Sequence, residues 1–222
     1  MQSVEYAPGR QADVFGEPAE PTVLLWHGMQ SDARAAVRTL AGLLADRGPT
    51  VVAPDWDSQA DDGGRDDLLR SARFALQLSG QTALVVVGWS MGGLAAAGLT
   101  INASRLGIPL RHTVCLAGAF TATDPITGEP PARGLAGAEP RTPFTLLHGA
   151  GDDVVPVSAS RDFAGELARH GWQAEFVEIN ADHASIACAT YDPVGRRYSA
   201  AIDPETLSVA TDVATRIAAT FD

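Results

Sequence analysis

A serine lies at the centre of the most informative segment of the chain, Gly88-Trp89-Ser90-Met91-Gly92. The β-branched run Val85-Val86-Val87 precedes it, and the small-residue run 94–99, which favours a helix, follows it. A sharp turn from a strand into a helix presents the serine hydroxyl, and glycines on both sides relieve the crowding at such a turn. The pattern predicts that Ser90 is a nucleophile for acyl transfer. The alternative is an ordinary glycine-containing loop between a strand and a helix.

A serine hydroxyl is a weak nucleophile at neutral pH, so it needs a base, and the base needs an acid that orients it. Of the five histidines, His183 follows the last expected strand and is the expected base, with His27 and His148 as alternatives that more plausibly organise loops. Two carboxylates, Asp152 and Asp153, follow the strand before it, although aspartates also favour loops for their own hydrogen bonds. Serine, carboxylate and histidine thus occur in the order typical of hydrolases with this turn.

The tetrahedral intermediate of acyl transfer requires two backbone N–H donors. One is expected from Met91, the residue after the nucleophile, because it opens the following helix. The other is expected from Met29, since Gly28 lets the loop after an early strand turn tightly. The side chains at 29 and 91 are then free to shape an acyl pocket, and Trp89 and Gln30 are candidate substrate-binding residues.

The rest of the chain alternates between short apolar runs and amphipathic segments, which predicts a parallel sheet covered by helices on both faces. Ligands of such sheets bind at the carboxyl ends of the strands. The expected strands are 22–26, 50–53, 83–87, 113–116, 144–147 and 174–179, and the expected helices are 33–47, 65–78, 91–106, 159–171 and a C-terminal helix at about 204–221.

Two segments break the alternation. Residues 119–143 are rich in Pro, Gly and Thr, and we interpret them either as a functional, lid-like loop or as a disordered surface excursion. Residues 189–203 are a candidate wall of a substrate pocket.

Composition limits the classes of function. The length of 222 residues favours a single domain spanning 1–222. A formal charge of −11 disfavours nucleic acids and anionic membranes as partners, and all 16 basic residues are arginine, which excludes mechanisms that need a lysine. The N-terminus lacks a signal peptide and no apolar stretch is long enough to span a membrane, so we expect a soluble cytoplasmic protein. The two cysteines lack metal-type spacing, and nothing indicates the oligomeric state.

In five segments the chain resembles the α/β-hydrolase superfamily, in its branch of small single-domain esterases and dienelactone-hydrolase-like enzymes. The segments are His27-Gly28, Ala53-Pro54-Asp55, Gly88 to Gly93, His148-Gly149 with Asp152 and Val155-Pro156, and Asp182-His183. The resemblance implies an α/β-hydrolase fold with a mostly parallel central sheet, helices on both faces and no large cap domain. It also implies that Ser90 is the nucleophile, His183 the base and Asp152 the acid, with the N–H groups of Met29 and Met91 as the oxyanion hole.

Asp152 is preferred to Asp153 because it occupies the family position four residues before Pro156. The chain departs from the family in two places. Met29-Gln30 replaces the extra glycines of lipase-like esterases, and only the Pro-rich loop 119–143 stands where many relatives carry a helical cap. The nucleophilic cysteine of true dienelactone hydrolases is also absent.

The resulting expectation is a serine hydrolase that cleaves small-molecule carboxylic esters of small to medium acyl chain through an acyl-enzyme, without a metal or cofactor. One alternative is a thioesterase or acyltransferase that works on an acyl carrier. The other is a non-catalytic binding protein with a hydrolase fold.

Overall fold

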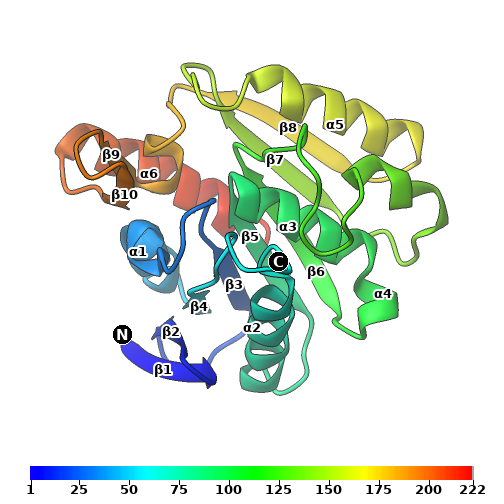
Figure 1. The fold of residues 1–222 in the computed structure, drawn as a ribbon, viewed down its shortest axis with the longest axis horizontal. Coiled ribbons are helices and arrows are strands. Elements are labelled where there is room, and N and C mark those ends of the chain that lie inside the picture. The colour runs from blue at the N-terminus through cyan, green and yellow to red at the C-terminus, as the bar shows by residue number, and fades with distance from the viewer. Residues whose placement is uncertain (222) are drawn as a thin grey trace.

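An eight-stranded sheet forms the centre of the computed structural model, which describes residues 1–221 (Figure 1). Its strand order is β1-β2-β4-β3-β5-β6-β7-β8. Strands β4, β3, β5, β6, β7 and β8 are parallel, whereas β1 pairs with β2 and β2 with β4 in antiparallel fashion. The strands are β1 (Gln2–Ala7), β2 (Arg10–Phe15), β3 (Thr22–Trp26), β4 (Thr50–Pro54), β5 (Leu84–Trp89), β6 (Leu110–Leu116), β7 (Phe144–Gly149) and β8 (Ala174–Ile179).

Helices cover both faces of the sheet. They are α1 (Arg38–Ala45), α2 (Arg65–Leu78), α3 (Met91–Ile101), α4 (Ala103–Leu106), α5 (Val157–Arg169) and α6 (Pro204–Ala218), with 3-10 turns η1 (Arg34–Val37), η2 (Pro131–Gly137) and η3 (Ser185–Ala187). Side chains of β3 alternate between the two layers, as strand geometry requires. Leu24 and Trp26 join the core beneath α2, α3 and α5, while Val23 and Leu25 join the core beneath α1 and α6. The expected fold class, a mostly parallel sheet between two helical layers, is therefore confirmed.

The structure differs from the sequence-based expectations at several boundaries. The N-terminal hairpin β1–β2 was not expected, because its polar residues at the edge of the sheet weaken the strand pattern. The expected helix 33–47 begins with η1, and the expected helix 91–106 is divided at Asn102, whose amide donates to the Gly98 carbonyl. The C-terminal helix ends at Ala218 rather than Phe221.

The segment 119–143 contains η2 and packs beside α3. The Asp124 side chain is fully buried there and accepts hydrogen bonds from the N–H groups of Ile126 and Thr127. A Cβ on Gly98 would overlap this carboxylate, so the glycine permits the close approach. Gly98 lies eight residues beyond Ser90, which corresponds to about 12 Å along a helix. This part of the segment therefore lies along the flank of α3.

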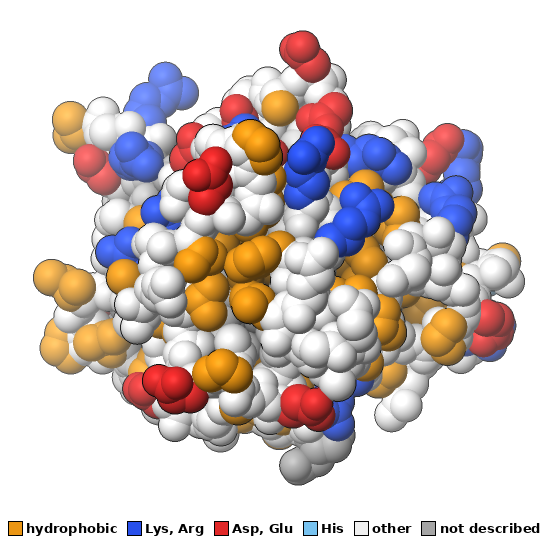
Figure 2. Space-filling model, turned by 90° about the horizontal axis from the view of Figure 1, so that it is seen from below, with side chains coloured by type: hydrophobic (Ala, Val, Ile, Leu, Met, Phe, Trp, Pro, Cys, Tyr) orange, Lys and Arg blue, Asp and Glu red, His pale blue; other side chains and the backbone are white. Residues whose placement is uncertain are grey.

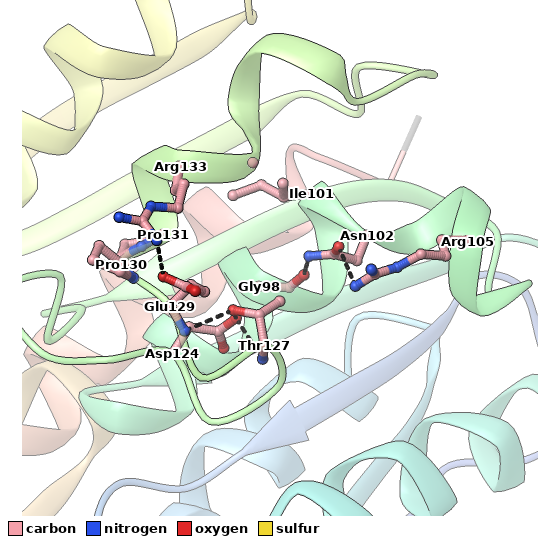
Figure 3. Close-up of a pocket in the computed structure, with 11 residues that line it drawn as sticks. Gly98, Ile101, Asn102, Arg105, Asp124, Thr127, Glu129, Pro130, Pro131 and Arg133 are labelled. Carbon is pink, nitrogen blue, oxygen red and sulfur yellow. Dashed lines mark hydrogen bonds and ion pairs between the residues drawn. The ribbon is translucent and has the colours of Figure 1, made fainter.

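A cavity of about 220 Å³ separates α3 from this segment (Figure 3). Its charged and amide side chains pair with one another: Arg133 contacts Glu129, and Arg105 donates to Asn102. The first contact lies within the segment and the second within the helical region, so each stays on its own side of the cavity.

The second irregular segment forms a separate hairpin, β9 (Ala189–Asp192) and β10 (Arg197–Ala200), next to the N-terminal end of α6 (Figure 1). On the face shown in Figure 2, hydrophobic side chains form small patches between acidic and arginine side chains. No helix within residues 1–221 has the length and apolar character that crossing a membrane requires.

Candidate active site

The turn after β5 places Ser90 at the carboxyl edge of the sheet. Ser90 has φ 57° and ψ −117°, a backbone conformation that is unfavourable for residues other than glycine. The strand enters this turn so close to the helix that a Cβ on Gly88 would lie 2.0 Å from the Gly92 carbonyl oxygen. A Cβ on Gly92 would lie 2.3 Å from the His27 carbonyl oxygen. Both glycines are thus required by the close approach of backbone segments.

Three side chains from separate loops form a hydrogen-bonded series. His183, after β8, places its Nε2 3.1 Å from the Ser90 Oγ. Its Nδ1 lies 2.8 Å from an oxygen of Asp152, after β7. An ionised carboxylate only accepts hydrogen bonds, so Nδ1 carries the proton and Nε2 is free to accept the proton of the serine hydroxyl.

The surroundings of Asp152 favour its ionised form. Burial of the carboxylate opposes ionisation, but hydrogen bonds from His148, from His183 and from the Val155 N–H outweigh it and hold the pKa of Asp152 below its usual value. The N–H groups of Val154 and Val155 donate to Oδ1 at 2.9 and 2.8 Å. Asp152 is therefore a fixed negative charge next to the imidazole of His183.

A buried histidine, His148, contacts Asp152 and the loop that carries it. It is fully buried, and its Nε2 lies 2.9 Å from the Val155 carbonyl oxygen and 3.3 Å from an Asp152 oxygen. Its Nδ1 contacts the hydroxyl of Ser160 at 2.7 Å. The ring thus organises the loop that carries Asp152, and both of its nitrogens are occupied away from Ser90.

The loop after β3 brings backbone N–H groups close to Ser90. A Cβ on Gly28 would lie 3.2 Å from the Cβ of Ser90, so the loop lies directly against the serine. Among the described residues, the N–H groups of Met29 and Met91 have no hydrogen-bond partner within the protein. Both are available to an external acceptor at this edge of the sheet, and Met91 also stands at the positive end of α3.

His27 fixes the loop from its buried side. The ring is fully buried and stacks on Trp56, with centroids 5.5 Å apart. Nδ1 lies 2.8 Å from the Gly28 carbonyl oxygen, and Nε2 accepts from the N–H groups of Ala33 and Trp56 at 3.3 and 3.2 Å. Burial lowers the pKa of His27 to about 4, so the ring is neutral near pH 7. The Gly28 carbonyl and the Met29 N–H belong to one planar peptide. The His27 ring, which holds the carbonyl, therefore also orients the Met29 N–H.

Ion pairs anchor the end of the same loop. Arg34, at the start of η1, pairs with Asp55 after β4 and with Asp13 on β2. Asp55 also accepts the backbone N–H of Arg34 at 3.0 Å. The loop between β3 and α1 is therefore tied to two neighbouring strands.

The expected substrate-binding side chains have internal partners. Trp89 is almost fully buried, and its Nε1 donates to the His183 carbonyl oxygen at 2.8 Å, which positions the backbone of His183. Gln30 exchanges two hydrogen bonds with the backbone of Tyr198, at 2.7 and 3.1 Å. The side chain of Met29 is 61% exposed, whereas Met91 packs partly against the core.

Tyr198 is the residue at this site that inspection of the sequence did not single out. Its ring contacts Trp89 edge-on, with centroids 4.9 Å apart, and its centroid lies 6.2 Å from that of His183. The only signal was its place in the irregular segment 189–203. The hairpin that carries Tyr198 contacts the catalytic region through residues far away in sequence.

The remaining groups are metal-type side chains and the two cysteines. Between residues 1 and 221 there is no group of three or more His, Cys, Asp or Glu side chains suited to hold a metal ion. Cys115 and Cys188 are free thiols, and burial raises the pKa of both above the usual value.

Comparisons with known proteins agree with this architecture. The model of the "Alpha/beta hydrolase family" matches residues 23–219. A butyrate-bound thermophilic esterase from Thermogutta terrifontis has a TM-score of 0.71 at 17% identity, over 97% of this chain and 92% of the esterase. Thermogutta terrifontis esterase 2 phosphorylated by paraoxon gives 0.71 at 18% identity over the same shares. An esterase of Pyrobaculum calidifontis gives 0.65 at 17% identity, over 95% of this chain and 80% of that one. At such identities the solved structures support the fold, and no curated protein sequence matched the chain.

Proposed function

Because the chain belongs to the alpha/beta hydrolase family, we propose that it is a serine hydrolase that cleaves carboxylic esters of small to medium acyl chain. The hydrogen-bonded series Ser90–His183–Asp152, at the carboxyl edge of the sheet, carries this proposal. A base within 3.1 Å of a serine hydroxyl is within the distance that proton transfer requires.

The proposed reaction proceeds through an acyl-enzyme. His183 accepts the proton of Ser90 as the Oγ attacks the ester carbonyl carbon, and the ionised Asp152 stabilises the imidazolium that forms. The negative charge on the carbonyl oxygen is stabilised by the N–H groups of Met29 and Met91. His183 then protonates the leaving alcohol, and later activates the water molecule that releases the acid.

Replacement of the nucleophile tests the proposal. Ser90→Ala should lower kcat for p-nitrophenyl butyrate on the order of 10⁶-fold, as loss of a serine nucleophile does elsewhere. It should also abolish covalent labelling by a fluorophosphonate probe. Ser208→Ala, which alters an exposed serine on α6, is the matched control and should retain turnover and labelling. Wild-type turnover in a folded Ser90→Ala protein would contradict the mechanism.

The acyl-chain preference is tested with p-nitrophenyl esters of increasing length. We expect kcat/KM to be highest for short and medium chains, because the elements formed by residues 1–221 include no large cap domain. A monotonic rise through long-chain esters would contradict this part of the proposal.

A further inference from the structure

The chemistry of the proposed reaction decides on which side of Ser90 the alcohol portion of an ester lies. The leaving oxygen must receive its proton from Nε2 of His183, which is the atom 3.1 Å from the Ser90 Oγ. The carbonyl oxygen must instead point toward the N–H groups of Met29 and Met91. The alcohol portion therefore extends past His183, away from the oxyanion donors.

A groove of about 560 Å³ is lined by His183 and not by Ser90, Met29 or Met91. Its lining residues are Asp153 and Val154 after β7, Asp182, His183 and Ala184 after β8, and Tyr191 and Tyr198 of the β9–β10 hairpin. It opens to solvent and has room for a small alcohol.

The pairing of the hairpin decides which of its side chains face the groove. Tyr191 and Tyr198 are direct cross-strand partners, so their side chains share one face, and their ring centroids are 4.9 Å apart. Asp192 and Arg197 are the next cross-strand pair, and the period of two places them on the opposite face. The groove is therefore lined by the two rings, and the arginine of β10 points away from it.

The charges at the groove are negative. Asp153 is exposed and lines the groove, and it makes no ion pair or side-chain hydrogen bond with any described residue, which leaves its carboxylate available. Asp182 lines the groove as well, although its Oδ1 also accepts the N–H groups of Ala184 and Ser185. Burial raises the pKa of the Tyr198 hydroxyl, and the carboxylates of Asp152, Asp153 and Asp182 raise it further. All of these charges act on the ring with the same sign.

We propose that this groove binds the alcohol portion of the ester and favours an alcohol that carries a positive charge, such as a quaternary ammonium alcohol, over an uncharged one. The inference rests on the proposed function. Two tyrosine rings beside the carboxylates of Asp153 and Asp182 attract a cation through the ring quadrupole and through charge. The same carboxylates repel an anionic leaving group, which disfavours an acyl-coenzyme A thioester.

A matched pair of substrates tests this preference. Butyrylcholine and 3,3-dimethylbutyl butyrate have the same acyl group and nearly the same shape, and differ by one positive charge. For each, kcat/KM is measured by titration of the released acid and divided by the rate constant of hydroxide-catalysed hydrolysis, which removes the intrinsic difference between the leaving groups. We expect the ratio of the normalised kcat/KM of butyrylcholine to that of 3,3-dimethylbutyl butyrate to be at least about two to five.

Variants assign the preference to the groove. Asp153→Asn and Tyr198→Leu should each lower the ratio by about two- to five-fold, whereas Tyr198→Phe, which keeps the ring, should retain it. Glu175→Gln is the matched control: it also removes one carboxylate, but near the start of β8, whereas His183 and the groove follow the end of that strand. It should leave the ratio unchanged. Choline should inhibit hydrolysis of p-nitrophenyl butyrate competitively, and more strongly than 3,3-dimethylbutanol.

The outcomes separate this inference from the proposed function. A ratio at or below one, together with Ser90-dependent hydrolysis of p-nitrophenyl butyrate, would overturn the inference and leave the esterase proposal intact. A ratio above one that Asp153→Asn and Tyr198→Leu do not change would also overturn the assignment to this groove. Absence of Ser90-dependent hydrolysis of every ester would overturn the proposed function, and the inference with it.

Discussion

Replacement of His27 by phenylalanine tests whether a buried ring orients the oxyanion donor at Met29. The substitution keeps an aromatic ring against Trp56 but removes the partner of the Gly28 carbonyl and the acceptor of two buried N–H groups. Each buried N–H group left without a partner costs about 1–3 kcal/mol, so the free energy of unfolding should fall by about 2–6 kcal/mol. This is a large part of the roughly 5–15 kcal/mol that stabilises an ordinary domain.

The effect on catalysis should be smaller than complete loss of an oxyanion donor, which lowers kcat by about 10²–10³-fold. The Gly28 carbonyl retains a second hydrogen bond, from the Gln30 N–H at 2.8 Å, and this bond still restrains the peptide that carries the Met29 N–H. We therefore expect His27→Phe to lower kcat about 10–100-fold, with a smaller change in KM, because the donor acts mainly on the transition state.

The assay is the hydrolysis of p-nitrophenyl butyrate, measured alongside urea unfolding to establish that the variant is folded. His112→Phe is the matched control: this half-buried histidine on β6 contacts Thr145 at 2.9 Å, in the half of the strand farther from Ser90, and its loss should leave kcat unchanged. A folded His27→Phe protein with unchanged kcat would show that the ring only packs the loop. If His27→Phe does not fold, His27→Asn, which is smaller and polar, provides the same comparison.

Further changes follow from the same geometry. Asp152→Asn should lower kcat by about 10⁴-fold with little change in KM, because the amide favours the wrong tautomer of His183, and steady-state kinetics measures this. Gly92→Ala should lower kcat, and it should lower the free energy of unfolding by about 1–3 kcal/mol, because its Cβ would meet the His27 carbonyl oxygen. Gly165→Ala is the control, because the new methyl group on α5 has open space around it, and this change should stabilise the protein. The free energy of unfolding should also fall as the pH drops from 6.5 to about 4, since the unfolded chain binds a proton at His27 before the folded chain does. The difference between the two pKa values of His27 corresponds to about 3 kcal/mol of stability. Urea titrations at several pH values measure it, and the same pH dependence of the free energy of unfolding in His27→Phe as in the wild type would contradict the assignment to His27.

The central part of the fold was predictable because the signals there are local. Each parallel strand is a short apolar run, and in a parallel sheet the residues after β5, β7 and β8 share one edge. Ser90, Asp152 and His183 could therefore be expected in one place before any contact between them was known. The glycines at 88 and 92 were predictable for the same reason, since the turn geometry itself demands them.

Residues 189–203 were expected as a candidate wall of a pocket, but the contacts that place individual side chains around the site could not be predicted in this way. Tyr198 reaches Trp89 and His183 only because β10 pairs with β9 and because Gln30, 168 residues earlier, binds its backbone. The segment 119–143 shows no periodicity, and it lies beside α3 through contacts such as that of the buried Asp124 carboxylate with Gly98. Such contacts are specified by pairs of distant residues, and a single sequence carries no periodic signal for them.

Gln30 links the two sides of the proposed site. Its amide bonds the backbone of Tyr198 on the groove wall, and it follows Met29, whose N–H is the proposed oxyanion donor. The Gln30 N–H also donates to the Gly28 carbonyl, and this hydrogen bond spans Met29. The loop that would position the carbonyl oxygen of the substrate is therefore the same loop that binds the β9–β10 hairpin. Movement of the hairpin would therefore disturb the oxyanion donor as well as the groove.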